Sequence, residues 1–94
     1  MMATTTASVP TDSGSRYLQQ LCKHWGHKFD VTFDAQRGTV ALPQALTTMV
    51  AEAGSLRVTI DAEDPAVLDR MKGVVAEHLD RFAFKEAPLA FDWK

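Results

Sequence analysis

The stretch Ser15-Arg16-Tyr17-Leu18-Gln19-Gln20-Leu21-Cys22-Lys23-His24-Trp25-Gly26-His27-Lys28 contains more of the chain's chemically distinctive side chains than any other segment. It holds two of the three histidines, the only cysteine, the only tyrosine and one of the two tryptophans. Its apolar residues follow the i, i+3, i+4, i+7 spacing of one helix face: Leu18, Leu21, Cys22 and Trp25. Asp12, Ser13 and Ser15 are candidate N-caps, and Gly26 is a candidate left-handed residue at the C-terminus. The sequence therefore predicts an amphipathic helix over 12–25.

Segments whose large apolar residues recur at every second position follow this helix and predict strands with one buried face. They cover residues 28–34, 39–42 and 56–61. In the first segment, Phe29, Val31 and Phe33 point to one side, so all three are expected in the core. A turn at 36–38 joins the first two segments into a hairpin.

Three further segments are less regular. Residues 2–9 are rich in threonine and small residues and end before a proline, which suits a strand. Residues 46–52 combine helical spacing with β-branched residues, but a tight turn at Gly54-Ser55 favours a strand that pairs with 56–61. Residues 87–93 alternate in polarity and predict a short edge strand.

A second helix is predicted from Asp64-Pro65 to about Phe82. The aspartate supplies an N-cap oxygen, and proline is favoured at the first helical position. A broad apolar stripe runs along this helix and includes one histidine: Val67, Leu68, Met71, Val74, Val75, His78, Leu79 and Phe82.

The predicted order of elements is strand, helix, four strands, helix, in a single domain over 1–94. Strands that are polar on one side are typical of antiparallel sheets with one covered face. The fold class is therefore α+β: a two-layer sandwich in which an antiparallel sheet carries both helices on one face. The open face has mixed charge and is expected to be solvated or to form a homodimer.

The composition narrows the function classes. A formal charge of −2 gives no basic footprint for nucleic acid. A single cysteine rules out an internal disulfide and fits a reducing compartment. No run of 18 apolar residues is present, and the first ten residues lack the features of a signal peptide. The expectation is a cytoplasmic protein without a membrane or nucleic-acid partner.

Two blocks of the sequence resemble a known family. The first comprises Ser15-Arg16-Tyr17-Leu18, Cys22-Lys23-His24-Trp25 and His27-Lys28, and the second comprises 74–86 together with Trp93. They are similar to the signatures of small bacterial proteins catalogued as domain of unknown function 2218, over nearly the whole chain. The resemblance implies a strand–helix–four strands–helix arrangement similar to the TATA-binding-protein fold. It also implies an association with siderophore-interacting, iron-assimilation proteins, and it supplies no catalytic residues.

His24 and His27 are the candidate metal ligands, because imidazoles three positions apart on a helix can share an ion. Two ligands are half a site, so another subunit would have to complete it. The alternative is a pair of surface histidines near a helix C-terminus, where a cation is favoured. Cys22 lies on the apolar face and is expected to be a core residue.

Arg16 and Tyr17 at the start of the first helix, with Arg81 at the end of the second, are candidates for a small cationic site. Such a site would take a carboxylate or a catecholate; the alternative is a set of solvated arginines. His78 lies at the centre of an apolar stripe, and a buried imidazole without a hydrogen-bond partner costs about 1–3 kcal/mol. It is expected either to bond a carbonyl or a polar group as a core histidine, or to line a ligand pocket.

The family resemblance favours a small non-enzymatic accessory or binding module linked to iron–siderophore handling, with a siderophore-interacting flavoprotein as the expected partner. One alternative is a metal- or haem-binding protein that uses His24 and His27. Another is a subunit of an enzyme whose catalytic residues lie elsewhere. The sequence identifies no cofactor.

Overall fold

The computed structural model describes residues 3–86 and 89–94, which form five strands and two helices. In chain order these are β1 (Ala3–Pro10), α1 (Gly14–Trp25), β2 (Asp30–Phe33), β3 (Arg37–Leu42), β4 (Ala45–Glu52), β5 (Ser55–Ala62) and α2 (Pro65–Phe82). No helix in this part of the chain combines the length and apolar character needed to cross a membrane.

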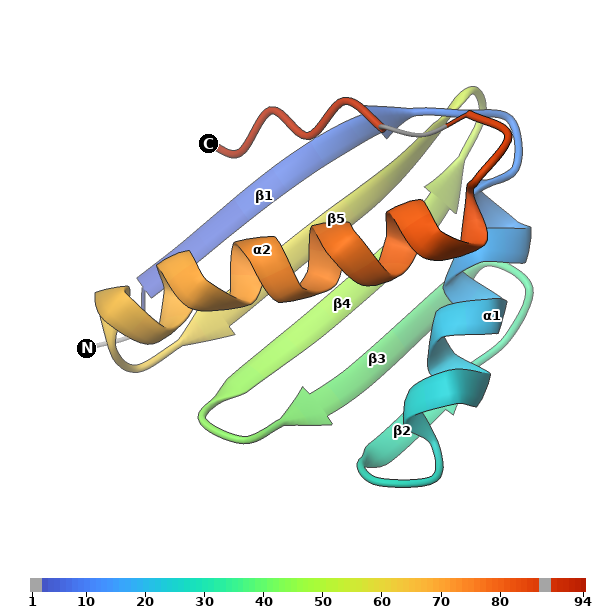
Figure 1. Ribbon diagram of the computed structural model, residues 1–94. Helices are drawn as coiled ribbons and strands as arrows, with labels where there is room; N and C mark the ends of the chain where they lie inside the picture. The colour runs from blue at the N-terminus through green and yellow to red at the C-terminus, as the bar shows by residue number, and fades with distance from the viewer. Residues whose placement is uncertain (1–2, 87–88) are drawn as a thin grey trace.

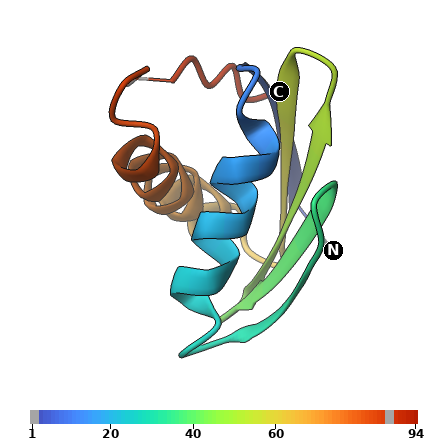
Figure 2. The ribbon, with the colours of Figure 1, turned by 90° about the vertical axis from the view of Figure 1, so that its right-hand side faces the viewer.

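The strands form one antiparallel sheet in the order β1-β5-β4-β3-β2 (Figure 1). Strands β2 to β5 are a meander in which each pairs with the next, whereas β1 pairs with β5 at the opposite edge. Both helices cover the same face (Figure 2). The α+β class with helices on one face is confirmed. The predicted first strand is β1 apart from Met2, which lies outside the described residues.

The core lies between the helices and the inner face of the sheet. The predicted apolar face of α1 is buried, with Leu18, Leu21 and Cys22 fully enclosed and Trp25 nearly so. The sheet and α2 contribute the other large, fully buried apolar side chains: Val9, Val40, Met49, Leu56, Val58, Ile60, Val75 and Leu79. Some residues predicted as core are only partly buried at its margin: Phe29, Val31, Met71 and Phe82.

The turn before α1 is held by Thr11 rather than by a helix cap. Ser13 occupies the N-cap position, but its side chain makes no capping hydrogen bond. Instead, the Ser13 N–H donates to Thr11 Oγ1 at 3.1 Å. A threonine before the helix therefore organises its entry.

The C-terminus of α1 differs from the prediction. Gly26 has φ −61°, so it is right-handed, and its N–H donates to the Cys22 carbonyl at 2.8 Å. The chain keeps turning because the Trp25 carbonyl accepts the N–H of Phe29 at 2.9 Å. This extra turn delays β2 until Asp30, two residues after the predicted start.

Phe33 was predicted to lie in the core, and this is wrong. It is 36% exposed, because β2 is the sheet edge and the cross-strand partner, Gly38, offers no side chain to pack against.

The hairpin turn between β2 and β3 is held by Asp34, whose Oδ1 accepts the backbone N–H groups of Gln36 and Arg37, each at 2.8 Å. These two hydrogen bonds hold the pKa of Asp34 below its ordinary value.

The ambiguous segment 46–52 is a strand, as predicted, and belongs to β4. Glu52 pairs with Ser55, so the two-residue turn is Ala53-Gly54, one position earlier than expected. Gly54 has φ 75°, a left-handed conformation that glycine adopts without the cost of a Cβ clash.

The edge strand predicted at 87–93 does not form in the described part of that segment, and residues 87–88 lie outside the described residues. The chain instead ends beside the free edge of β1 (Figure 1). There the Lys94 N–H donates to the Thr6 carbonyl at 2.9 Å, and the Thr6 N–H donates to the Lys94 carbonyl at 3.3 Å. Leu89 is buried, and its N–H donates to Asp80 Oδ1 at 2.8 Å. One pair of backbone hydrogen bonds thus replaces the predicted strand.

Helix α1 lies against β3 at a position where the sheet has no side chain. A Cβ added to Gly38 would lie 2.7 Å from Cys22 Sγ and 3.4 Å from Leu18 Cδ1. The first distance is too short for a real contact, so the glycine permits the close approach of the helix to the strand.

We predict that Gly38→Ala lowers the free energy of unfolding by about 1–3 kcal/mol, because the added methyl group overpacks the core against Cys22. Adding Cys22→Ala should restore part of this loss by removing the sulfur. Gly73→Ala is the matched control: Gly73 is exposed in α2, its added Cβ meets nothing within 4 Å, and the change should stabilise by about 0.5–1 kcal/mol. Urea denaturation followed by circular dichroism measures all four proteins. Wild-type stability in Gly38→Ala would contradict the close approach.

Candidate ligand-binding site

The start of α1 and the chain that follows α2 meet at one end of the molecule, beside the β4–β5 turn (Figure 1). The Tyr17 hydroxyl donates to the Glu86 carboxylate. The Thr11 hydroxyl contacts both Glu86 oxygens, at 3.1 and 3.0 Å, and the Thr11 N–H donates to the Gly54 carbonyl at 3.2 Å. Glu86 therefore joins the C-terminal segment both to α1 and to the connection that precedes it.

Tyr17 is buried, and its pKa is raised above its ordinary value of 10.0. The largest cause is the hydrogen bond to Glu86, because an ionised phenol no longer has a proton to donate; burial acts in the same direction. Tyr17 is thus a neutral hydrogen-bond donor at physiological pH.

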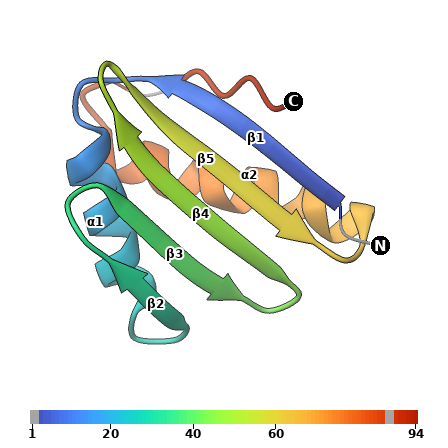
Figure 3. The same cartoon turned by 180° about the vertical axis from the view of Figure 1, so that it is seen from behind.

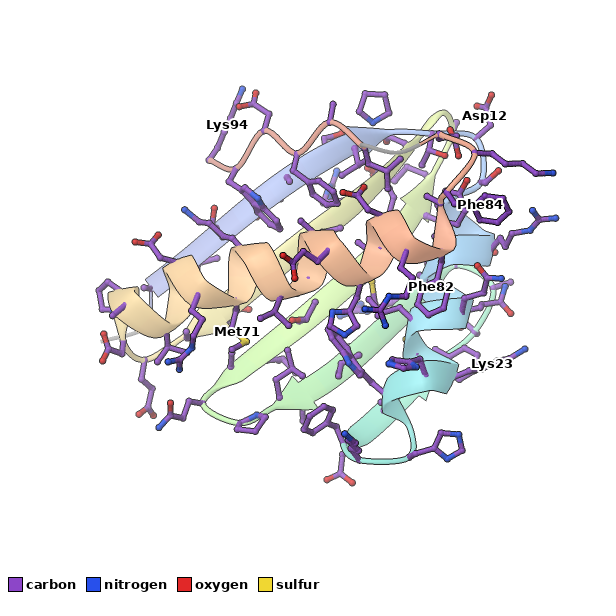
Figure 4. The ribbon with its side chains drawn as sticks, viewed as in Figure 1. Asp12, Lys23, Met71, Phe82, Phe84 and Lys94 are labelled. Carbon is purple, nitrogen blue, oxygen red and sulfur yellow. The ribbon has the colours of Figure 1, made fainter. Side chains whose placement is uncertain are left out.

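A hollow of about 120 Å³ opens beside this linkage. It is lined by residues of α1, by the end of α2 and by the chain that follows: Arg16, Tyr17, Gln20, Phe82, Phe84 and Lys85. Phe84 is 73% exposed, an unusual position for a large apolar side chain. Figure 4 shows Phe82 and Phe84 near the end of α2, beside the first turns of α1.

The charges that border the hollow are positive. Arg16 and Lys85 are exposed, and neither forms an ion pair within the described residues. Glu86 is near, but it does not line the hollow, and its oxygens face Tyr17 and Thr11. The hollow thus combines aromatic surface with two available cations, an arrangement that suits a small aromatic anion.

A cluster of histidines and aromatic residues lies two helical turns further along α1, between the helices. The ring centroid of His24 is 5.7 Å from that of His78 and 5.9 Å from that of Phe82, and Trp25 lies 4.9 Å from His78. The His78 Nδ1 is 2.6 Å from the Val74 carbonyl oxygen. A carbonyl only accepts, so Nδ1 is the donor in this contact, and Nε2 is the ring nitrogen that does not take part in it. His78 is half-buried and bonded to a backbone carbonyl, one of the two arrangements expected from the sequence.

The structure separates the residues predicted to bind a ligand. Arg16 and Tyr17 line the hollow. Arg81 is exposed in the last turn of α2 and does not line it, and His78 lies in the histidine cluster instead.

His24 and His27, the predicted metal ligands, are both exposed. His27 lies beyond the end of α1, in the extra turn that follows Trp25. The structure brings His24 next to His78. Within 3–86 and 89–94, no group of three or more His, Cys, Asp or Glu residues is arranged to hold a metal ion. Cys22 is buried, and burial raises the pKa of its thiol to about 11.

The part of the hollow that comes from Gln20, Phe84 and Lys85 was not predicted from the sequence. A partial signal was present, because Phe84 and Lys85 directly follow the second predicted helix, and binding residues are often found in connecting segments. No local pattern shows, however, that Glu86 returns to Tyr17, which lies 69 positions earlier.

A larger hollow, of about 410 Å³, lies at the other end of α1 between the α1–β2 and β3–β4 turns. It is lined by Gly26, Lys28, Phe29, Asp30, Ala41, Leu42 and Pro43. Its single cation and single carboxylate balance each other, and only one aromatic residue faces it. The smaller hollow therefore carries the more specific chemistry, and we regard it as the candidate site.

The fold and this hollow define a small two-layer α+β domain with an aromatic, cationic hollow at one end. The chain belongs to the family described as "Uncharacterized protein conserved in bacteria (DUF2218)", whose model matches residues 6–94. A solved structure titled "NMR structure of PA4090 from Pseudomonas aeruginosa" is similar, with 34% sequence identity and a TM-score of 0.81. That match covers 97% of this chain and 94% of the other. No curated protein matches the chain. The resemblance to the family is confirmed.

We predict that Tyr17→Phe lowers the free energy of unfolding at neutral pH by about 1.5–3 kcal/mol, because a hydrogen bond to a carboxylate is lost. The folded pKa of Tyr17 lies above the unfolded value, so the folded protein holds the phenolic proton more tightly than the unfolded chain. This stabilisation is complete below about pH 10 and is lost as the pH rises through the folded pKa. The difference in free energy of unfolding between wild type and Tyr17→Phe, measured by urea denaturation, should therefore become smaller at alkaline pH.

Tyrosinate absorbance gives an independent measurement, because Tyr17 is the only tyrosine. Glu86→Gln is the matched variant, since it keeps the shape of the side chain but removes the charged acceptor. It should move the Tyr17 pKa back toward its ordinary value. A folded Tyr17 that titrates at or below about 10 in the wild type would contradict the linkage.

Proposed function

We propose that the protein is a non-enzymatic binding module whose hollow takes the aromatic end of a small anion. The observation that carries this proposal is the lining of the hollow, which combines two aromatic residues, Phe82 and Phe84, with two cations, Arg16 and Lys85. Aromatic faces stack on an aromatic ring, and a guanidinium or an ammonium pairs with its carboxylate or phenolate.

The size of the hollow limits the ligand to about one ring. An apolar protein cavity of about 150 Å³ holds a benzene molecule, and this hollow of about 120 Å³ is open on one side. A single benzoate or catecholate ring is therefore the largest aromatic group we expect there, with its substituents directed outward to the cations. Groups of this chemistry form the iron-binding ends of aryl-type siderophores. The fit supports the iron–siderophore link that the family resemblance implies.

The test is a titration with 2,3-dihydroxybenzoate, followed by protein NMR chemical shifts. We predict a dissociation constant on the order of 0.1–1 mM, because a ligand of this size makes few contacts. The largest shifts should fall on Gln20, Phe82, Phe84 and Lys85. Arg16→Gln should weaken binding about tenfold, the cost of one charged hydrogen bond.

Arg81→Gln is the matched control, because it removes the same charge from an exposed residue that does not line the hollow. It should leave the affinity within about twofold of wild type. If the two substitutions weaken binding equally, the affinity for the anion depends only on the net charge of the protein. That result, or shifts elsewhere in the protein, would refute the proposed site.

A second candidate function, metal binding, is favoured by the contact between His24 and His78. Two imidazoles on one tetrahedral ion, at metal–nitrogen distances of about 2.1 Å, have ring centroids roughly 5 Å apart. The observed separation of 5.7 Å is close to this value. The Nδ1 of His78 is engaged by Val74, so Nε2 is the nitrogen available to a metal. Water or another molecule would supply the remaining ligands.

Titration with Zn²⁺ or Cu²⁺ tests this candidate and separates the two possible histidine pairs. If His24 and His78 share the ion, His24→Gln and His78→Gln each weaken binding by about tenfold or more, and His27→Gln leaves it unchanged. Dependence on His24 and His27 alone would support the pair predicted from the sequence. Insensitivity to all three substitutions would refute a histidine site.

A further inference from the structure

The open face of the sheet carries a row of threonines, one from each strand. Cross-strand pairing places them side by side in the order Thr6, Thr59, Thr48, Thr39 and Thr32. The helices lie behind the sheet when this face is viewed (Figure 3). The hydroxyls of Thr6 and Thr59 are within hydrogen-bond distance, at 3.2 Å. The row therefore crosses the whole uncovered face at right angles to the strands.

The charged residues that flank this row directly differ in sign between its two sides. On one side, register places Arg57, Val50 and Arg37 next to one another across β5, β4 and β3. On the other side of the row, register aligns four residues across the sheet. They are Asp61 of β5, Leu46 of β4, Ala41 of β3 and Asp30 of β2. The face thus has an arginine side and an aspartate side.

The aspartate side is also hollowed and apolar at its centre. A hollow of about 280 Å³ is lined by Gln44, Ala45, Leu46, Asp61 and Glu63. Leu46 is 41% exposed, and among the large apolar side chains of the described residues only Phe84 is more exposed. Leu46 can contact the aliphatic part of an arginine side chain, and the carboxylates of Asp61 and Glu63 can pair with its guanidinium.

We infer that this face binds a second copy of the same chain, related by a two-fold axis that runs along the threonine row. Rotation about that axis turns the arginine side of one copy onto the aspartate side of the other. Arg57 and Asp61 occupy equivalent positions of β5 on either side of Thr59, so Arg57 of each copy faces Asp61 of its mate. Likewise, Val50 of each copy faces Leu46 of the other.

Threonines suit the position on the axis, because each meets its own equivalent. A hydroxyl both donates and accepts a hydrogen bond, so a row of hydroxyls is complementary to itself. A row of like charges on this axis would repel itself. The two sheets would pack face to face with nearly aligned strands, as in β-sandwiches.

Two features limit the strength of this dimer. Arg57 already contacts Glu52 at 2.9 Å, although both side chains are well exposed and a guanidinium has further donors for Asp61. Strands of these lengths make a face on the order of 500 Å² per copy, which is the low end for a specific interface. The dimer is therefore weak, with a dissociation constant on the order of 10–100 μM.

The test is sedimentation velocity from about 10 μM to about 1 mM protein, with two single variants and their mixture. Arg57→Asp places two carboxylates at each contact, and Asp61→Arg places two arginines there, so each variant alone should be monomeric. An equimolar mixture should form a heterodimer, because both contacts then join an arginine to an aspartate. Arg70→Asp, the same change at an exposed position of α2, is the control and should dimerise like the wild type.

The mixture distinguishes this geometry from other forms of association. Circular dichroism first establishes that both variants are folded. A wild-type protein that stays monomeric at about 1 mM overturns the proposal and leaves the face to a different partner. Dimers that persist in both variants, or variants that fail to associate when mixed, overturn the two-fold axis along the threonine row.

Discussion

The distance between α1 and the sheet is the constraint on which the rest of the structure depends. Gly38 sets it, because the sulfur of Cys22 occupies the space that any larger residue on β3 would need. Helix α1 crosses the sheet from β5 toward β2, so this contact near its middle positions both of its ends. One end presents Tyr17 to Glu86, and the other presents His24 to His78. Both candidate sites thus depend on one close contact.

The helices and most strands could be predicted because their periodicity and turn residues are local. Local patterns fail where burial depends on distant neighbours. Phe33 has the alternation of a core strand, but that alternation reports which side of the sheet a residue faces and not whether that side is covered. Gly26 fails for a local reason instead: it is a plausible helix terminator, but the Trp25 carbonyl accepts the Phe29 N–H and the chain keeps turning.

Only part of the candidate site could be predicted, because some of its residues are brought together by contacts that are distant in the sequence. Arg16 and Tyr17 stand in a recognisable first helical turn, and both line the hollow. Arg81 was placed there because it ends the second helix, but neighbouring helical residues point about 100° apart, so Arg81 and Phe82 do not share one direction. The missing members follow the helix, and only the long-range contact of Glu86 with Tyr17 places them.

The sheet order has a consequence for synthesis of the protein on the ribosome. β1 is made first, but its strand partner is β5, which follows four intervening elements. Strands β2 to β5 are joined by short turns and need only their neighbours, whereas pairing of β1 requires closure of a long loop. We expect the four-stranded meander to assemble while β1 waits unpaired. Thr4, Thr5 and Thr6 keep β1 polar, so this strand is poorly suited to aggregation before it pairs with β5.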